Sequence, residues 1–312
     1  MKLYTYDLPF RGTRRKGIII ELLREDGSKS LGEVAPLPNW NLETFDDALE
    51  QLKGPMQQHM LLPSVAFGLE TAKLGLNPPK LPLSFPLSSL LMGSADEILK
   101  KAELCARAEI RSVKVKLSGL SHADALKVVR ALKDSFSLRI DLNRAWDKAR
   151  ALEFFAHFKP EDFDYIEEPC EKVEDLFDFP YPLAVDESLR DTPLDLLLTL
   201  PSLKAFIFKP TLQGGFTVGE VLAQAAKERN LDLIFSSAFE TGVGISQIAL
   251  LAHQLGVPIK PLGLDTYSYL EEDILQKPLN ISQGYLHLDE LFNVKKELLH
   301  ALPDPSCAAT LC

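Results

Sequence analysis

Apolar segments along the chain follow two different rhythms, and the change between them predicts a domain boundary. In the first part of the chain, three short segments have the alternation of strands and two have the periodicity of helices. The strand segments are residues 2–7, 17–24 and 31–35, and the helical segments are residues 42–53 and 64–74. Strands followed by helices predict a small α+β domain over residues 1–80.

Beyond a proline-rich stretch at residues 77–82, strands and helices alternate, as they do in β/α units. The predicted strands are residues 83–91, 112–117, 138–142, 165–169, 184–188, 206–209 and 232–236, with a shorter and weaker eighth strand at 259–264. Eight such strands predict a closed parallel barrel covered by helices. The predicted fold class is therefore α/β: a (β/α)7β TIM-like barrel over residues 81–284 with an N-terminal α+β capping domain. A further strand at 285–288 is expected to return to the first domain, so that residues 285–312 complete it.

Charged residues recur at the ends of successive barrel strands, where a buried strand should carry none. From Lys116 the steps are 25 residues to Asp141, 26 to Glu167, 19 to Asp186 and 23 to Lys209. Each step has the length of one strand, one helix and two loops. In a barrel of this type the reacting groups lie at the C-terminal ends of the strands, so these five residues form the candidate active site.

Three carboxylates that face one another repel and need a cation between them. Hard anionic oxygens, with water as a further ligand, suit Mg²⁺, so Asp141, Glu167 and Asp186 are candidate metal ligands. The alternative is that these acids are surface residues or helix caps at the starts of loops. Their recurrence at successive strand ends, with Lys116 and Lys209 on either side, favours the metal site.

The lysines supply candidate acid–base chemistry. A lysine beside a bound cation and a second lysine has its protonated form disfavoured, and it can then act as a base near neutral pH. Such a set can remove a proton next to a carboxylate while the metal stabilises the enediolate that forms. Lys114 and Lys116 share one strand face, and an exposed face whose side chains extend to water is the alternative. Lys209, on the other side of the acids, argues against that alternative.

The composition of the chain limits the kinds of molecule that it is expected to bind. The net charge of −10 argues against a nucleic-acid partner, because phosphate binding needs a basic face. No uncharged apolar stretch reaches the ~20 residues of a membrane helix, and the first residues show no signal-peptide pattern. The four cysteines form no CxxC pair, which indicates free thiols in a reducing compartment. We expect a cytoplasmic protein, a monomer or small homo-oligomer, whose partner is a small-molecule carboxylate.

The order Lys-x-Lys, Asp, Glu, Asp, Lys resembles the enolase superfamily, in its muconate-lactonizing subgroup. Several stretches are similar, more closely, to the o-succinylbenzoate synthase family. These are GEVAPLP with ET (residues 32–38 and 43–44), RIDLNRAW (139–146), IEEPC (166–170), KPTL (209–212), SS with E (236–237 and 240) and GLDT (263–266). The resemblance spans nearly the whole chain.

The resemblance implies a role for each candidate. Lys116 would be the general base that removes the α-proton and then, as an acid, helps hydroxide leave, while Lys209 would stabilise the enediolate by its charge. Asp141, Glu167 and Asp186 would hold Mg²⁺, with Mn²⁺ as a substitute. The implied supporting or substrate-binding residues are Lys114, Arg139, Asn143, Ser237 and Gly263. Glu168 is expected to face away from Glu167 on its strand.

The implied reaction belongs to menaquinone biosynthesis. It is the dehydration of 2-succinyl-6-hydroxy-2,4-cyclohexadiene-1-carboxylate to o-succinylbenzoate, catalysed by a carbon–oxygen lyase. In this family the loop at residues 9–16 closes over the substrate. Its basic residues suit a dicarboxylate, although a plain solvated loop is an equal alternative.

Two other functions stay open. An N-acylamino-acid racemase or dipeptide epimerase would use the same lysines, and a non-catalytic barrel would use none of them. Dipeptide epimerases carry two aspartates around strand eight, and this chain has only Asp265 there. The intact set of five charged residues argues against a non-catalytic barrel.

Overall fold

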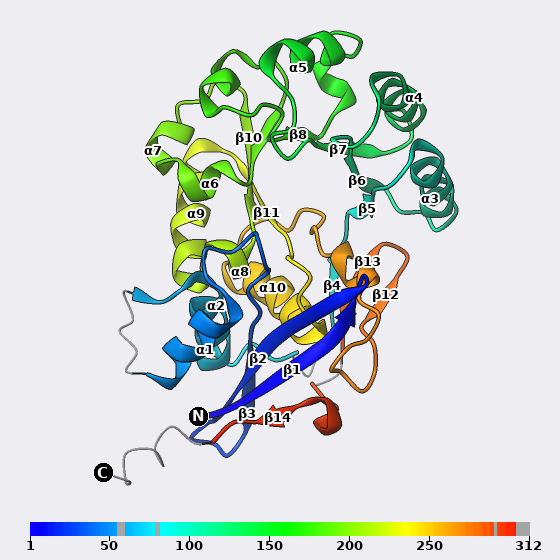
Figure 1. Cartoon of the computed structure of the whole chain (residues 1–312). Helices are drawn as coiled ribbons and strands as arrows, with labels where there is room; N and C mark the ends of the chain where they lie inside the picture. The colour runs from blue at the N-terminus through cyan, green and yellow to red at the C-terminus, as the bar shows by residue number, and fades with distance from the viewer. Residues whose placement is uncertain (55–59, 79–81, 290–291, 304–312) are drawn as a thin grey trace.

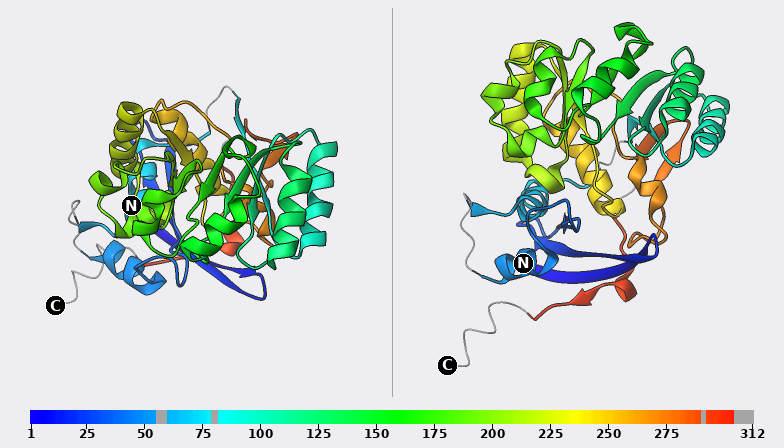
Figure 2. Two further views of the ribbon diagram at one scale, coloured as in Figure 1. Left: turned by 90° about the horizontal axis from the view of Figure 1, so that it is seen from above. Right: turned by 45° about the horizontal axis from the view of Figure 1, so that its top comes forward.

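A four-stranded antiparallel sheet and a seven-stranded parallel sheet dominate the computed structural model of the chain (Figure 1). The structure describes residues 1–54, 60–78, 82–289 and 292–303. The antiparallel sheet lies at one end of the molecule, and the parallel sheet curls above it with helices on its outer side (Figure 2). The cysteines at 307 and 312 and part of the predicted linker at 77–82 lie outside the described residues.

The antiparallel sheet has the order β14-β1-β2-β3. Its strands are β1 (Lys2–Phe10), β2 (Thr13–Leu23), β3 (Lys29–Val34) and β14 (His300–Ala301). A two-residue turn, Arg11–Gly12, joins β1 to β2, and both residues have positive φ angles of 49° and 74°. This combination belongs to tight hairpin turns that match the twist of the strands. Much of the predicted loop at 9–16 is therefore strand, with Arg11 at the tip of the hairpin.

Two helices cover one face of this sheet, and both begin and end as the sequence dictates. They are α1 (Phe45–Lys53) and α2 (Pro63–Leu74). Thr44 and Asp47 form a reciprocal capping box at the start of α1, and Gly75 ends α2 in the left-handed conformation. Gly32 and Gly68 let α2 lie directly on β3, since a Cβ at Gly32 would come within 1.9 Å of the Gly68 carbonyl oxygen. The predicted α+β arrangement is thus present.

The parallel sheet runs in chain order from β5 to β11. Its strands are β5 (Ser89–Leu91), β6 (Ser112–Lys116), β7 (Ser137–Asp141), β8 (Tyr165–Glu167), β9 (Leu183–Val185), β10 (Leu203–Phe208) and β11 (Asp232–Phe235). The predicted eighth strand is reduced to two residues, Leu262 and Gly263, which form isolated bridges to both edges of the sheet. Leu262 exchanges hydrogen bonds with the segment before β5, and Gly263 with the segment after β11. These bonds close the barrel, because both sheet edges find backbone partners.

Helices follow the strands along the outside of the barrel (Figure 1). They are α3 (Ala95–Arg107), α4 (His122–Leu132), α5 (Lys148–Phe155), α6 (Ser188–Asp191), α7 (Leu194–Leu197), α8 (Pro210–Gln213), α9 (Phe216–Arg229) and α10 (Gly242–Gln254). Short 3-10 turns are η2 (Pro160–Asp162), η3 (Val173–Asp178), η4 (Asp265–Tyr269) and η5 (Lys296–Leu298). The main apolar core lies between these helices and the sheet, and a smaller cluster around Tyr165 and Ile207 fills the barrel interior.

The predicted strand at 83–91 is split in two, which corrects the sequence interpretation. Its first half, β4 (Leu83–Pro86), pairs with β13 (Tyr285–Leu288) in a small antiparallel sheet with β12 (Asn280–Ser282). Pro86 cannot donate a ladder hydrogen bond, so the strand breaks there before β5 begins. Residues 285–288 are a strand as predicted, but they pair with β4 rather than with the first sheet. The segment that returns to the first sheet is β14, beside β1.

Arg15 joins the antiparallel sheet to the barrel. Its side chain is buried, and its guanidinium donates to the carbonyl oxygens of Ala35 and Pro36 on one side and of Ala238 and Phe239 on the other. A charged donor that satisfies several buried carbonyls makes strong hydrogen bonds. Arg15 therefore fixes two loops relative to each other.

Arg15→Met should destabilise the protein by about 3 kcal/mol, because buried carbonyls lose a charged donor and are left unsatisfied. The free energy of unfolding from a urea titration measures the effect. Arg14→Met is the matched control: Arg14 is exposed and pairs with Asp7 on the surface, which contributes little. Equal stability of the two variants would contradict the role of Arg15.

Among the described residues, no helix is both long and apolar enough to cross a membrane. Cys105 and Cys170 are buried free thiols.

Candidate active site

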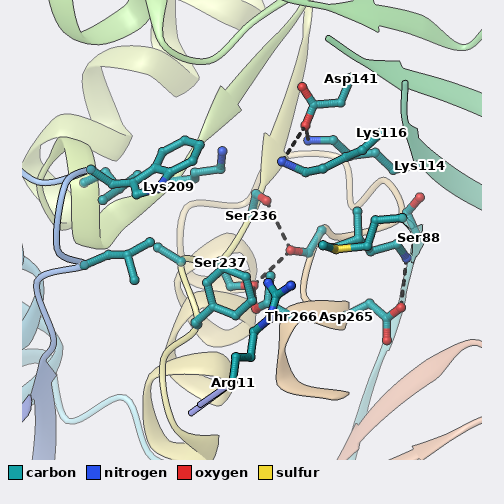
Figure 3. Close-up of a pocket in the computed structure, with 18 residues that line it drawn as sticks. Arg11, Ser88, Lys114, Lys116, Asp141, Lys209, Ser236, Ser237, Asp265 and Thr266 are labelled. Carbon is teal, nitrogen blue, oxygen red and sulfur yellow. Dashed lines mark hydrogen bonds and ion pairs between the residues drawn. The ribbon is translucent and has the colours of Figure 1, made fainter. Parts of the chain in front are cut away.

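A cavity of about 220 Å³ lies between the C-terminal edge of the parallel sheet and the first domain (Figure 3). The first domain contributes Arg11, Leu37 and Trp40 to its wall. The barrel contributes charged residues at one end and serines, a threonine and apolar side chains elsewhere. A cavity with an apolar wall and a few convergent charges is the usual form of a small-molecule site.

Strand register brings the predicted charged residues together. Lys116 pairs with Asp141, and Asp141 pairs with Glu167, because β6, β7 and β8 are adjacent parallel strands. Asp186 and Lys209 directly follow the ends of β9 and β10. Of these five, Lys116, Asp141 and Lys209 line the cavity, whereas Glu167 and Asp186 are buried beneath it. The predicted cluster at the strand ends is therefore present.

Lys114 is largely buried between two acids. Its Nζ is 2.7 Å from the Glu167 carboxylate and 3.0 Å from Asp141 Oδ2. Burial lowers the pKa of Lys114, but the attraction of Asp141 and Glu167 outweighs burial and the net pKa is raised well above its usual value. Lys114 thus stays protonated and serves as a fixed positive charge.

Lys116 is placed to reach a ligand. Its side chain is 29% exposed, compared with 12% for Lys114, and it lines the cavity. Its Nζ donates to Asn143 Oδ1 at 2.9 Å and lies 3.5 Å from Asp141 Oδ2. Asn143 is in turn held by Glu187 Oε1, to which its Nδ2 donates at 3.0 Å. Asn143 therefore orients the amine of Lys116, as a supporting residue would.

Lys209 stands on the other side of the cavity, where its Nζ donates to Asp186 Oδ2. Burial lowers the pKa of Lys209, but the attraction of Asp186 outweighs it, so the net pKa is raised. The ring of Trp40 lies near both lysines, with its centroid 5.9 Å from Lys116 Nζ and 5.8 Å from Lys209 Nζ. The acids next to Lys114 and Lys209 thus raise the pKa of both amines.

The buried acids Asp141, Glu167 and Asp186 are paired with Lys114, Lys116 and Lys209, and their pKa values shift in different directions. Burial, with repulsion from Asp141, raises the pKa of Glu167 to about 8, whereas Lys114 and Lys116 overcome burial and hold the pKa of Asp141 below its usual range. One carboxylate oxygen each of Asp141 and Glu167 is buried and has Lys114 Nζ as its ionic partner, at 3.0 Å and 2.7 Å. Within the described residues no three acidic, histidine or cysteine side chains are already grouped so as to hold an ion, and lysine ammonium groups lie among the acids. The hard carboxylate oxygens of Asp141, Glu167 and Asp186, all three buried, nevertheless suit a divalent cation.

Glu168 faces away from the cavity, in line with strand alternation. It is buried, and its Oε1 accepts hydrogen bonds from the backbone N–H groups of Asp186 and Ser188 at 2.8 and 2.7 Å. Burial and the nearby Glu187 raise its pKa to about 7. Glu168 has a positive φ of 43°, a conformation that is costly for a non-glycine residue. Glu168 thus fixes the turn that carries Asp186.

The remaining predicted residues fall into two groups. Ser237 and Gly263 line the cavity, and Ser237 Oγ donates to the Gly263 carbonyl at 3.0 Å. Arg139 does not line it: its guanidinium bonds Asp164 Oδ2 and the Pro261 carbonyl, at the opposite end of strand β7. Arg139 points into the barrel because it shares a face with Asp141, but it lies one layer below the site. It supports the barrel.

Sequence reasoning missed Trp40 as part of the cavity wall, whereas Arg11 lies on the loop at 9–16 that the family resemblance places over the substrate. Trp40 follows β3 in a loop whose path is tied to the barrel by Arg190, which donates to the Trp40 carbonyl at 2.5 Å. Nothing in the local pattern shows where this loop packs. Only its position next to the quoted GEVAPLP stretch could have drawn attention to it.

Comparisons with known proteins agree with this barrel and its cap. Residues 97–291 match the family model "Enolase C-terminal domain-like", and residues 1–76 match "MenC, N-terminal domain". Solved structures of muconate cycloisomerase from Pseudomonas fluorescens and of the L-Ala-D/L-Glu epimerase from Bacillus subtilis have the same fold. Their TM-scores are 0.78 and 0.77 at 20% and 14% identity, over 95% and 96% of this chain and 95% and 98% of theirs. The fold and site define a barrel enzyme of the enolase superfamily.

Relatives of known function identify the family of the chain within this superfamily. The o-succinylbenzoate synthase of Vibrio cholerae serotype O1 (strain M66-2) is 33% identical over 85% of this chain and 88% of its own length. That of Pectobacterium atrosepticum is 31% identical over 88% of this chain and 92% of its own length. The chain belongs to the o-succinylbenzoate synthase family.

Proposed function

We infer that this chain is a carbon–oxygen lyase, an o-succinylbenzoate synthase. It converts 2-succinyl-6-hydroxy-2,4-cyclohexadiene-1-carboxylate to o-succinylbenzoate and water, in menaquinone biosynthesis. The observation that carries this inference is the placement of Lys116 and Lys209 on opposite sides of one cavity, above buried carboxylates, in a member of this family. The cytoplasm is the location we propose.

Lys116 is the proposed acid–base group. Its amine removes the proton from the ring carbon that bears the carboxylate, and the electron pair moves into that carboxylate to give the enediolate. The resulting ammonium then gives its proton to the hydroxyl group on the neighbouring carbon as the C–O bond breaks, so that water leaves and the ring becomes aromatic. Asn143 Oδ1 keeps the Lys116 amine in place for both transfers.

Lys209 acts by its charge rather than by moving a proton. Its ammonium, held by Asp186, faces Lys116 across the cavity and stabilises the negative charge that develops on the substrate. Its raised pKa keeps it protonated throughout. Trp40 forms an apolar part of the cavity wall next to both lysines and helps to exclude water from the reacting ring.

Asp141, Glu167 and Asp186 are the proposed Mg²⁺ ligands. When bound, Mg²⁺ supplies positive charge next to the substrate carboxylate and so favours loss of the α-proton. Enzymes of the superfamily generally use Mg²⁺, and the three buried carboxylates, whose hard oxygens are the ligands that Mg²⁺ prefers, support its use here.

Epimerisation of a dipeptide is the alternative, because the same two lysines could each move a proton. An epimerase needs a free acid to bind the amino group of the dipeptide. Asp265 lines the cavity, but its Oδ2 accepts from the backbone N–H of Leu90 at 2.8 Å and lies 3.1 Å from Lys101 Nζ. Its charge is already neutralised, which favours the synthase.

A paired assay tests this function. The purified chain with Mg²⁺ should dehydrate the cyclohexadiene carboxylate, followed by the absorbance of the aromatic product, at a rate that far exceeds any racemisation of N-acyl amino acids or epimerisation of dipeptides. Racemisation or epimerisation without dehydration would instead assign the chain to the alternative activity.

A further inference from the structure

The turns that follow two neighbouring barrel strands have a strained backbone. Asn143 and Arg144 follow β7 with φ angles of 44° and 59°, and Glu168 follows β8 with a φ of 43°. This left-handed conformation is uncommon for residues other than glycine, and it persists only where surrounding contacts impose it. The two turns begin next to the candidate metal ligands Asp141 and Glu167. Contacts that hold these turns therefore bear directly on the site.

The Arg144 side chain binds groups that follow the next two strands. Its Nε donates to Glu168 Oε2 at 3.1 Å, and its Nη2 donates to Ser188 Oγ at 2.8 Å. Both terminal nitrogens also donate to the Asp191 carboxylate, at 2.6 and 3.0 Å, and the backbone N–H of Arg144 donates to the Glu168 carbonyl oxygen at 2.9 Å. A planar guanidinium that makes paired bonds to a carboxylate is a rigid link. Arg144 thus joins the turn after β7 to the turn after β8 and to helix α6, which follows β9.

Both sides of the proposed reaction depend on the groups that Arg144 holds. On one side Asn143, its neighbour in the chain, accepts a hydrogen bond from the Lys116 amine at 2.9 Å. On the other side Glu168 accepts from the backbone N–H of Asp186 at 2.8 Å and so fixes the position of that acid. Arg144 itself does not belong to the wall of the cavity. It therefore acts on the reaction only through these neighbours.

We propose that Arg144 is a positioning residue, which holds the Lys116 amine and the Asp186 carboxylate at fixed positions relative to each other. Removal of the α-proton needs the base and the charges that stabilise the enediolate to meet one substrate, and a misplacement of about 1 Å is costly. This inference rests on the proposed function, because it assigns a supporting residue to the same reaction. Arg144 contributes alignment rather than binding, so its loss lowers kcat and leaves KM nearly unchanged.

The first test is the steady-state kinetics of dehydration at saturating Mg²⁺. Arg144→Met should lower kcat by about tenfold to a hundredfold, whereas KM should stay within about twofold of the wild-type value. Arg144→Lys should keep part of the activity, since it keeps the charge but loses the paired bonds. Asp191→Asn should lower kcat less, because Arg144 keeps its bond to Glu168. Arg150→Met is the matched control and should leave kcat unchanged, because the Arg150 guanidinium stacks on Trp146, 4.5 Å from the ring centroid.

A double-mutant cycle distinguishes alignment from a general loss of structure. Because Arg144 acts on Lys116 through Asn143, Arg144→Met should cost clearly less in kcat when Asn143 has already been replaced by alanine than it costs in the wild type. A general loss of structure would cost the same factor in both backgrounds. Calorimetric titration with Mg²⁺ alone gives a second readout that is independent of activity. Arg144→Met should bind Mg²⁺ several-fold more weakly than the wild type and Arg150→Met, because Asp186 is no longer held through Glu168.

Any one of three results would overturn the proposal: an unchanged kcat in Arg144→Met, an equal cost of this change in the two backgrounds, or an unchanged affinity for Mg²⁺. If Arg144→Met does not fold, Arg144→Lys takes its place in the cycle and in the titration, with the same expected outcomes. Each contrary result, in a wild type that dehydrates the substrate, removes the role of Arg144 and leaves the proposed function intact. A wild type that does not dehydrate the substrate would instead overturn the proposed function, and the role of Arg144 with it.

Discussion

Lys116→Ala is expected to abolish dehydration, with a loss of 10²–10⁴-fold or more in kcat, because the variant has no group to remove the α-proton. The structure places the Lys116 amine at the cavity wall, held by Asn143, whereas the neighbouring Lys114 is ion-paired with Asp141 and Glu167. The progress of dehydration at saturating substrate measures kcat. Lys127→Ala is the control: Lys127 is exposed and pairs with Asp96 on the surface, so its loss should leave kcat unchanged.

Arginine variants separate the two lysines. Arginine keeps a positive charge but does not release its proton at any relevant pH. Lys209→Arg should therefore retain more activity than Lys116→Arg, because Lys209 is assigned a role in charge stabilisation alone. In a racemase each lysine would serve as the base for one hand of the substrate, and both variants would lose activity alike.

Equal loss of dehydration in the two arginine variants would refute this division of roles. A crystal structure or a ligand titration of Lys209→Arg distinguishes that outcome from displacement of the bulkier side chain, since a displaced arginine would also weaken binding of o-succinylbenzoate.

Removal of divalent cations is the second change with a large expected effect. Excess chelator should abolish dehydration, and added Mg²⁺ should restore it, because three buried carboxylates at one site repel one another and repel the substrate carboxylate. Asp186→Asn should raise the Mg²⁺ concentration needed for half-maximal activity while the far-UV circular dichroism spectrum stays that of the wild type.

Asp178→Asn is the matched control for Asp186→Asn, since Asp178 is exposed and pairs with Lys148 on the surface. It should leave the Mg²⁺ requirement unchanged. Full activity of the wild type in excess chelator would remove Mg²⁺ from the proposed mechanism altogether.

The predictions from sequence succeeded where the signal is local. Strand alternation and the regular spacing of β/α units placed Lys116, Asp141 and Glu167 on adjacent strands, and the register of β6, β7 and β8 confirms it. The same spacing predicted the barrel, because eight units of this length have few other ways to bury both faces of a parallel sheet. The helices α1 and α2 also begin and end near the predicted residues, since their caps lie within a turn of each end.

Local signals failed where pairing is decided by distant partners. The apolar run at 83–91 predicts one strand, but its two halves join different sheets, and which strand each half joins depends on β13, about 200 residues away. The eighth strand shrinks to Leu262 and Gly263 because a few backbone bonds to each edge suffice to close the barrel. Arg139 was expected to support the site or bind substrate, and its height in the barrel, not its sequence motif, places it below the cavity.

The sequence by itself thus determined the barrel, its cap and the charged residues of the strand ends, because these follow from periodicity along one stretch of chain. Which residues form the wall of the cavity became clear only from the tertiary structure. Trp40 reaches both lysines because Arg190 holds its loop against the barrel, and Arg11 faces the cavity because Glu271, far along the chain, binds its backbone. Such contacts join residues separated by 150 to 260 positions, and no local pattern carries the information that fixes them.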